Sequence, residues 1–238
     1  MVHFIIPARK GSKGLRHKNR RLVSLMEDRF PKKVKDRMIL TTDDPWLHQK
    51  FKKSLFRVHK RDKKLAQDDT SIKPVIERVA KKYRFYPNDD VCLLYPTYPQ
   101  RTYDDIREVL MDYQKNRCSS MLCCNEWGSN TWGYTMIDRD KDTRKATMVF
   151  PEEEGVYRRQ DSTTGRVGAV QSFEEKPTYY EYSHFVCIFK LRLLPQLNRN
   201  LYNLDKTVFY RLDEKKIDVD SEQDWMNYKK WEEKNGND

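Results

Sequence analysis

Short apolar segments alternate with amphipathic ones along most of this chain, and this order constrains the fold more than any other feature. Strand-like apolar runs occur at 2–8, 37–42, 54–59, 90–95, 119–124 and 184–189. Helical patterns fit 45–54, 72–85 and 102–116. Strands that alternate with helices predict a mainly parallel sheet covered on both faces. We therefore expect an α/β protein that forms a single domain over residues 1–238.

The alternation is lost between residues 125 and 180, where WGYTMI (132–137) and ATMVF (146–150) are strand-like runs among polar turns. We expect this region to form a small subdomain. Near the end of the chain, IDVD (217–220) predicts a strand, and a helix follows it. Ser221 suits the N-cap of that helix, with an acid three residues later.

The chain is basic, with a net charge of +11, which permits binding to nucleic acid. Most basic runs lie between apolar elements with acids interleaved, which is typical of solvated faces and argues against that partner. No apolar run approaches the roughly 18 residues that a membrane span needs, so we expect a cytoplasmic or nuclear protein. Five cysteines without ligand-like spacing indicate reduced, structural thiols.

A loop after the first strand concentrates the positive charge. Residues 8–19 contain two glycines, five lysines or arginines and no acid. Glycines let backbone N–H groups approach an oxyanion, and the basic side chains neutralise its charge. The loop has neither the Walker A nor the GxGxxG pattern. A nucleoside triphosphate is the ligand that such a cluster favours, and a solvated basic turn is the alternative.

A second group of charged residues is Asp218-x-Asp220. Alternation along a strand would place both carboxylates on one face, and two hard oxygen ligands suit Mg²⁺. Such pairs also occur by chance, so the pattern gains weight only beside the basic loop. Ligands of parallel sheets bind at the carboxyl ends of strands. The basic loop, Asp43-Asp44 and PTYPQR (96–101) all follow strands, which predicts one shared site.

ARKGSKGLRHKN (8–19) resembles the N-terminal signature A-R-x-x-S-K-G-x-x-x-K-N of the CMP-N-acylneuraminate cytidylyltransferases. Further similar segments follow in the family's order: LTTDD (40–44), LAQDDTS (65–71), LLYPTYPQRTYDDI (93–106), YRRQD (157–161) and KIDVDSEQDW (216–225). The resemblance covers most of the chain. It implies a Rossmann-like nucleotidyltransferase fold and the reaction of CTP with an acylneuraminate to give the CMP-sugar and pyrophosphate. It also implies a homodimer, with 125–180 contributing to the interface and the sugar site.

The resemblance further implies roles for residues of the basic loop. Arg9, Ser12 and Lys13 would hold the triphosphate. Lys18 would lie close to the reacting phosphate, and Asn19 near the nucleoside.

Other residues follow from the same resemblance. Arg61 lies where the family has a base-contacting arginine, with the spacing shifted slightly. Arg101 and Arg159 would face the phosphate or the sugar carboxylate. Tyr95, in the place of a family glutamine, would contact the substrate.

The implied mechanism is an in-line displacement in which the anomeric hydroxyl attacks the α-phosphorus and pyrophosphate leaves. Mg²⁺ on Asp218 and Asp220, together with Arg9 and Lys13, would position and neutralise the phosphates. A metal-bound hydroxyl or a carboxylate such as Asp220 would take the sugar proton, and the sequence leaves this choice open.

The chain departs from the family at the acceptor end. Tyr95 and Tyr98 replace a glutamine and a serine, and SHFV (183–186) replaces an N-G-A element, so Phe185 is expected to block close approach of the backbone to the ligand. Another keto-sugar acid is therefore an open alternative. The segment between Arg21 and Arg37 looks too short for a full helix.

Three other functions remain as alternatives. The first is another nucleotide-sugar enzyme, including a glycosyltransferase that uses the Asp pair, although such enzymes usually carry it near mid-chain. The others are an inactive relative and a non-enzymatic nucleic-acid-binding protein, whose binding would depend strongly on salt.

Overall fold

The computed structural model describes residues 1–54, 56–126, 136–139, 146–148 and 179–235. The strands of its central sheet are β1 (Val2–Pro7), β2 (Met38–Thr42), β3 (Arg57–Lys60), β4 (Asp90–Leu93), β5 (Ser120–Glu126), β8 (Tyr179–Lys190) and β9 (Thr207–Arg211). The helices are α1 (Lys18–Arg29), α2 (Lys32–Lys35), α3 (Pro45–Phe51), η1 (Lys63–Leu65), α4 (Lys73–Tyr83), α5 (Tyr103–Lys115), η2 (Leu191–Gln196) and α6 (Glu222–Asn235).

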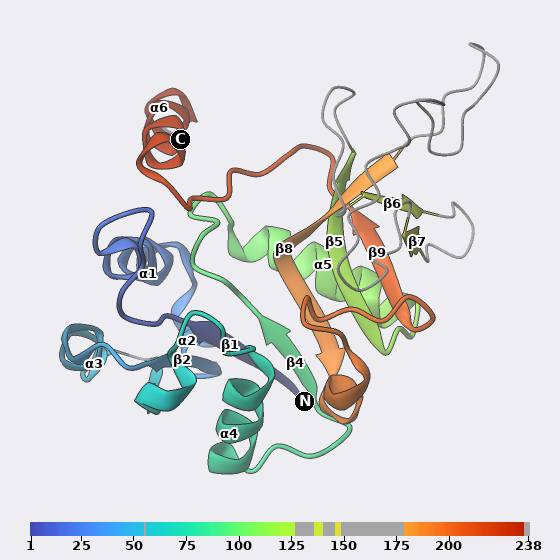
Figure 1. Cartoon of the computed structure of the whole chain (residues 1–238), viewed down its shortest axis with the longest axis horizontal. Coiled ribbons are helices and arrows are strands. Elements are labelled where there is room, and N and C mark those ends of the chain that lie inside the picture. The colour runs from blue at the N-terminus through green and yellow to red at the C-terminus, as the bar shows by residue number, and fades with distance from the viewer. Residues whose placement is uncertain (55, 127–135, 140–145, 149–178, 236–238) are drawn as a thin grey trace.

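The sheet has the strand order β3-β2-β1-β4-β8-β5-β9 (Figure 1). The pairs β1–β2, β1–β4, β2–β3 and β5–β9 are parallel, which confirms a mainly parallel sheet. β8 runs antiparallel between β4 and β5. The apolar pattern at 184–189 predicted this strand but carried no information on its direction, and β9 was not predicted.

Two short strands from the irregular region extend the sheet. β6 (Met136–Arg139) pairs antiparallel with the start of β8, and β7 (Ala146–Met148) pairs with β6. They overlap the two strand-like runs predicted there. The remainder of the predicted subdomain lies outside the described residues.

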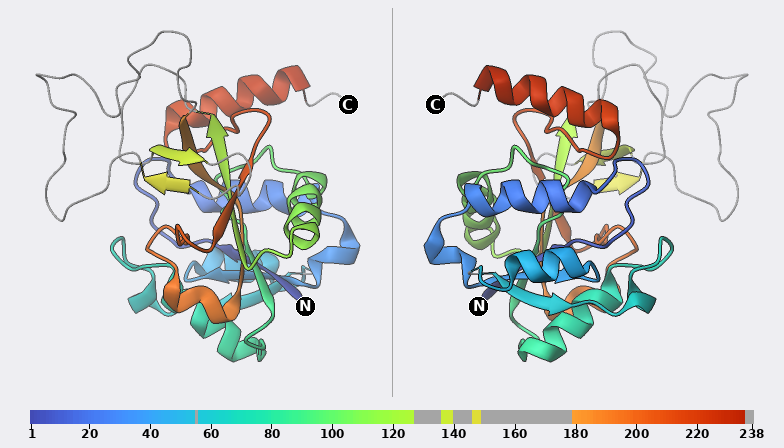
Figure 2. Two further views of the ribbon diagram at one scale, coloured as in Figure 1. Left: turned by 90° about the vertical axis from the view of Figure 1, so that its right-hand side faces the viewer. Right: turned by 90° about the vertical axis from the view of Figure 1, so that its left-hand side faces the viewer.

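Helices cover both faces of the sheet, as the sequence predicted (Figure 2). Phe4 and Ile6 of β1 point into a cluster that includes side chains of α1, α3 and α5. Ile5, between them, points into a second cluster with side chains of α4 and η2. β1 is therefore buried on both sides, which explains its unbroken apolar sequence. These two layers hold the carboxyl end of β1, and hence the basic loop, in a fixed place.

Two expectations about local structure were wrong. The segment judged too short for a helix belongs mainly to α1, which buries Leu22, Val23 and Met26. Its first turn is rich in basic residues, and its N-cap has no side-chain hydrogen bond, so the usual start pattern is absent. The segment 217–220 has no regular secondary structure and is not a strand of the sheet.

The predicted cap of α6 is confirmed, because the Ser221 side chain accepts from the Asp224 N–H. At α5, Thr102 and Asp105 form a capping box. The cap of α3 is Asp44, whose carboxylate accepts from the Trp46 N–H.

α6 packs beside α1, although the two helices lie at opposite ends of the sequence (Figures 1 and 2). Leu15, Leu22, Val219 and Tyr228 form the buried contact between them. This packing brings the residues just before α6 to the basic loop.

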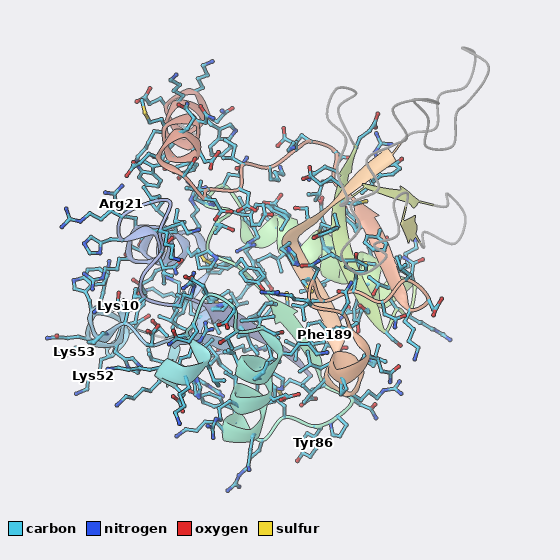
Figure 3. All side chains as sticks on the ribbon, viewed as in Figure 1. Lys10, Arg21, Lys52, Lys53, Tyr86 and Phe189 are labelled. Atoms are coloured by element: carbon cyan, nitrogen blue, oxygen red, sulfur yellow. The ribbon has the colours of Figure 1, made fainter. Side chains whose placement is uncertain are left out.

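The scattered lysines behave as a solvated surface. Figure 3 shows Lys52 and Lys53 projecting outward beyond α3, and Lys10 and Arg21 are also exposed. All five cysteines are buried thiols that form no disulfide with one another. Within the described residues, no helix is long and apolar enough to cross a membrane.

Candidate active site

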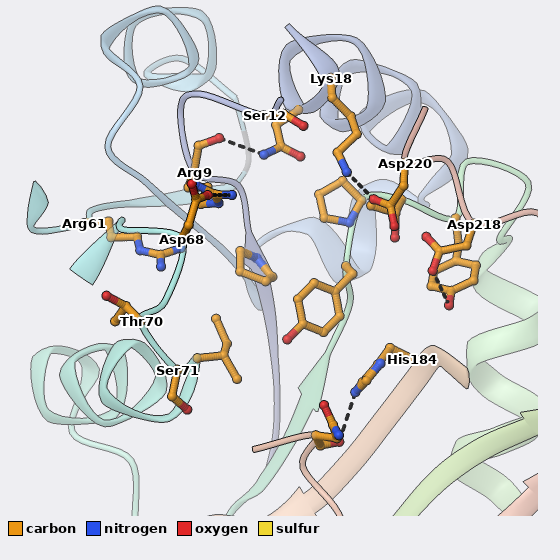
Figure 4. Close-up of a pocket in the computed structure, with 18 of the residues that line it drawn as sticks. Arg9, Ser12, Lys18, Arg61, Asp68, Thr70, Ser71, His184, Asp218 and Asp220 are labelled. Atoms are coloured by element: carbon orange, nitrogen blue, oxygen red, sulfur yellow. Dashed lines mark hydrogen bonds and ion pairs between the residues drawn. The ribbon is translucent and has the colours of Figure 1, made fainter. Parts of the chain in front are cut away.

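A cleft of ≈ 390 Å³ lies at the carboxyl ends of the central strands (Figure 4). Its walls come from the basic loop after β1, residues 61–72 after β3, the turn 95–98 after β4, and the segment before α6. Part of β8 and the η2–β9 connection complete it. Two of the segments expected to share one site, the basic loop and the turn after β4, both line this cleft, whereas Asp43 and Asp44 do not.

The backbone of the basic loop is held in place by hydrogen bonds with two side chains. Gly11 adopts φ +85°, a conformation that favours glycine. The Asn19 amide donates to the Arg9 carbonyl at 2.7 Å, and Asp43 accepts from the Lys10 N–H at 2.7 Å. The loop leads into the N-terminus of α1, whose first turn has no acidic residue. The basic side chains of the loop and the positive end of α1 make this an environment for anions.

The loop closes directly onto the segment before α6. A Cβ atom added at Gly14 would lie 2.2 Å from the Asp220 carbonyl oxygen, so only glycine permits this approach. The Lys18 ammonium forms an ion pair with the Asp220 carboxylate (Figure 4). The two sequence motifs singled out for chemistry are therefore in contact.

The Asp pair is positioned by the turn after β4. The Val219 N–H donates to the Thr97 carbonyl at 2.7 Å, and the Ile217 N–H donates to the Gln100 side chain at 2.8 Å. Val219 is fully buried, while Asp218 and Asp220 on either side of it both line the cleft. The alternation thus places both carboxylates at the cleft as predicted, but their segment is not a strand of the sheet.

Asp218 lies in a more enclosed environment than Asp220. Burial raises the pKa of Asp218, and the negative charge of Asp220 raises it further. The Tyr98 hydroxyl donates to Asp218 at 2.9 Å and accepts from the Ser183 hydroxyl at 3.3 Å. Two carboxylates side by side repel each other, and a bound cation relieves that repulsion.

The two carboxylates meet the minimum requirement for magnesium. In the parts of the chain that the structure describes, no group of three or more Asp, Glu, His or Cys side chains could hold a metal ion together. Mg²⁺ commonly takes one or two protein carboxylates and completes its shell with phosphates and water. Asp218 and Asp220 therefore fit Mg²⁺ that is bound jointly with a triphosphate.

Asp68, which the sequence did not single out, engages the cations of the loop. It accepts from Arg9 and, at 2.7 Å, from Lys13. These contacts, with Lys13 the larger influence, lower the pKa of Asp68. The resemblance of LAQDDTS to a family segment marked its neighbourhood, but nothing in that pattern indicated which residue pairs with the loop.

The remaining predicted arginines differ in placement. Arg61 lines the cleft and donates to the Leu65 carbonyl, and burial lowers its pKa. Arg101 does not line it: the residue is 1% exposed, and its guanidinium donates to the carbonyls of Phe185 and Tyr95. Arg101 therefore supports the walls of the cleft, and the predicted substrate contact is wrong in this arrangement. Arg159 lies outside the described residues.

One end of the cleft is formed by Tyr95 and His184, whose rings meet edge to face at 5.4 Å. His184 donates to the Asn200 carbonyl at 3.0 Å, and burial lowers its pKa, so the imidazole is neutral. Sequence reasoning did not single out His184, because it belongs to no catalytic or metal-ligand spacing. Phe185 does not block the cleft as expected, since it is fully buried against Tyr98.

No protein-family profile and no curated protein matches the sequence. Solved structures do match. CMP:2-keto-3-deoxy-manno-octonic acid synthetase complexed with CTP is similar over 98% of both chains, with a TM-score of 0.68 and 14% identity.

Two further structures are similar at lower scores. A cytidylyltransferase from Leptospira borgpetersenii serovar Hardjo-bovis has a TM-score of 0.54 and 16% identity over 98% of this chain and 86% of the other. A protein from Bacillus anthracis, described as a glucose-1-phosphate thymidylyltransferase in complex with a sucrose, has a TM-score of 0.55 and 10% identity over 97% and 95%. The chain therefore has the α/β fold of these nucleotidyltransferases.

Proposed function

We propose that this protein is a cytidylyltransferase that activates a keto-sugar acid of the acylneuraminate type with CTP, releasing pyrophosphate. One observation carries the proposal: the basic loop and the Asp pair, far apart in sequence, meet across Lys18 and Asp220 in one cleft. The similarity of the fold to a synthetase complexed with CTP supports the nucleotide.

The basic loop binds the triphosphate. Arg9 and Lys13 exchange their Asp68 partner for phosphate oxygens, and the Ser12 hydroxyl donates a further hydrogen bond. Phosphate carries more charge than a single carboxylate, so this exchange is favourable. Arg61 and Asn19 line the neighbouring wall and contact the nucleoside.

Asp218 and Asp220 would hold Mg²⁺, which when bound neutralises phosphate charge and orients the triphosphate. Tyr98 fixes Asp218 through its hydroxyl. Lys18 lies against Asp220 and contributes a positive charge where charge builds up on the reacting phosphate.

The transfer forms one bond and breaks one. The anomeric oxygen of the acid attacks the α-phosphorus, and the bond from that phosphorus to the pyrophosphate oxygen breaks. The hydroxyl proton passes to a carboxylate of the Asp pair or to solvent. Catalysis arises mainly from positioning and charge neutralisation.

Pyrophosphate release tests this function. The protein is incubated with Mg²⁺, each of the four ribonucleoside triphosphates or dTTP, and a panel of keto-sugar acids and sugar 1-phosphates. We expect release with CTP and a keto-sugar acid only. Release with dTTP or UTP and a sugar phosphate would assign another nucleotide-sugar enzyme. No release under any condition would indicate an inactive relative.

The homodimer remains a proposal from the family resemblance. Light scattering during gel filtration measures the mass of the particle in solution. A mass near twice the 28.8 kDa of one chain supports a dimer, and a mass of 28.8 kDa contradicts it.

A further inference from the structure

Arg199 lines the cleft and differs from the other basic residues there in its lack of a partner within the described residues. Arg9 is paired with Asp68, Lys18 with Asp220, and Arg61 with a backbone carbonyl. Arg199 has no ion pair or hydrogen bond of its side chain with any part of the chain that the structure describes. A cation that faces a cleft without an internal partner is available for an anionic ligand.

The turn that carries Arg199 is held in place by hydrogen bonds and by a buried residue. The Asn198 side chain accepts from the N–H groups of Asn200 and Tyr202 at 2.9 and 3.1 Å. Leu201 is fully buried in the left-handed region at φ 63°, a conformation that a leucine holds only where its surroundings require it. These contacts place the start of the Arg199 side chain at the cleft before any ligand binds.

This turn also belongs to the end of the cleft that Tyr95 and His184 form, which we take as the acceptor end. The Asn200 carbonyl accepts from His184, whose ring packs against Tyr95. Figure 4 shows His184 at the opposite side of the cleft from Arg9, Ser12 and Lys18. The residue after Arg199 is thus bonded to the wall farthest from the triphosphate cations. An aromatic ring, a neutral imidazole and an amide form a surface suited to a polar sugar.

We propose that Arg199 binds the carboxylate of the acceptor acid and thereby selects keto-sugar acids over neutral sugars. The inference rests on the proposed function. A guanidinium can hold a carboxylate through two parallel hydrogen bonds, which fixes orientation as well as charge. The buried Arg101 cannot serve this role because both of its terminal nitrogens are already bonded to carbonyls.

The test compares Arg199→Ala, Arg199→Lys and the control Arg192→Ala by steady-state kinetics. Arg192 is an exposed arginine of η2 that does not line the cleft, so the control removes the same charge. We expect Arg199→Ala to raise the KM for the acid at least tenfold, with the KM for CTP changed less than twofold. The KM of Arg199→Lys for the acid should lie between those of the wild type and Arg199→Ala. Lysine keeps the positive charge but cannot form the two parallel hydrogen bonds of a guanidinium. Arg192→Ala should match the wild type.

A second measurement separates this inference from the proposed function. Binding of the free acid and of its neutral methyl ester is followed by ligand-observed NMR without CTP. We expect the wild type to prefer the acid and Arg199→Ala to lose that preference. Such a result with no pyrophosphate release would uphold the Arg199 site and overturn the proposed function. An unchanged KM for the acid, or equal binding of acid and ester by the wild type, would overturn the inference.

Discussion

Lys18 and Asp220 lie 202 positions apart and form an ion pair where the basic loop meets the segment before α6. In the proposed reaction this pair lies beside the transferred phosphate. Lys18→Met and Asp220→Asn should each lower kcat by roughly 10²- to 10³-fold, the range for losing one transition-state contact. Steady-state turnover measures the effect.

The matched control is Asp213→Asn, which removes one exposed carboxylate from the same connection outside the cleft. It should retain full turnover. An Asp220→Asn variant as active as this control would refute the proposed role of the Asp pair.

Asp68 should compete with the triphosphate for Arg9 and Lys13. Asp68→Asn removes that competing charge, so CTP should bind more tightly, by roughly two- to fivefold given the modest strength of exposed ion pairs. Calorimetry measures Kd, with the neighbouring Asp69→Asn as the control. Weaker binding in Asp68→Asn would mean that Asp68 itself contacts the nucleotide.

Gly14 should tolerate no side chain. Gly14→Ala places a methyl group against the Asp220 carbonyl and should separate the loop from the Asp pair, at a cost of about 1–3 kcal/mol. CTP affinity and chemical denaturation both detect this. Gly11→Ala is the comparison, because a Cβ there meets open space and only the backbone conformation is strained. Equal affinity in the wild type and Gly14→Ala would contradict the close approach.

Asp89 should make folding sensitive to acid. Partial burial raises the pKa of Asp89, but the Tyr86 N–H, His3 and the amino group of Met1 outweigh it and hold the pKa at about 2. Because this lies below the ordinary value of 3.8, the stabilisation is complete above pH 4 and is lost as the pH falls toward 2.

Asp89→Asn should therefore lose about 2 kcal/mol of unfolding free energy at pH 7 and little at pH 2. Denaturant unfolding at both pH values measures this, with Asp205→Asn as an exposed control. The same loss at both pH values would show that the carboxylate charge is not the cause.

The sequence predicted the sheet and the position of the basic loop at its edge well, because both depend on local patterns. The apolar run of β1 and the glycine-rich basic loop after it are adjacent in the chain, and parallel strands bring loops at their carboxyl ends together. Asp218 and Asp220 lie on the same side of their segment, as the alternation predicted, although that segment is not a strand.

The side of the cleft that the proposal assigns to the acceptor depends on tertiary contacts that no local pattern encodes. The direction of β8 is set by its neighbours β4 and β5, and that direction decides which of its residues reaches the cleft. Arg101 looked available in the sequence, yet the fold buries it. Arg199 follows no motif at all, and only the turn fixed by Asn198 brings it to the site.

Identification of the product tests the central claim most directly. The protein is incubated with CTP, Mg²⁺ and a keto-sugar acid, and the mixture is analysed by mass spectrometry alongside pyrophosphate. We expect one CMP ester of the acid for each pyrophosphate released. Release of pyrophosphate with free CMP and no ester, or no consumption of CTP with any acid, would contradict the assignment.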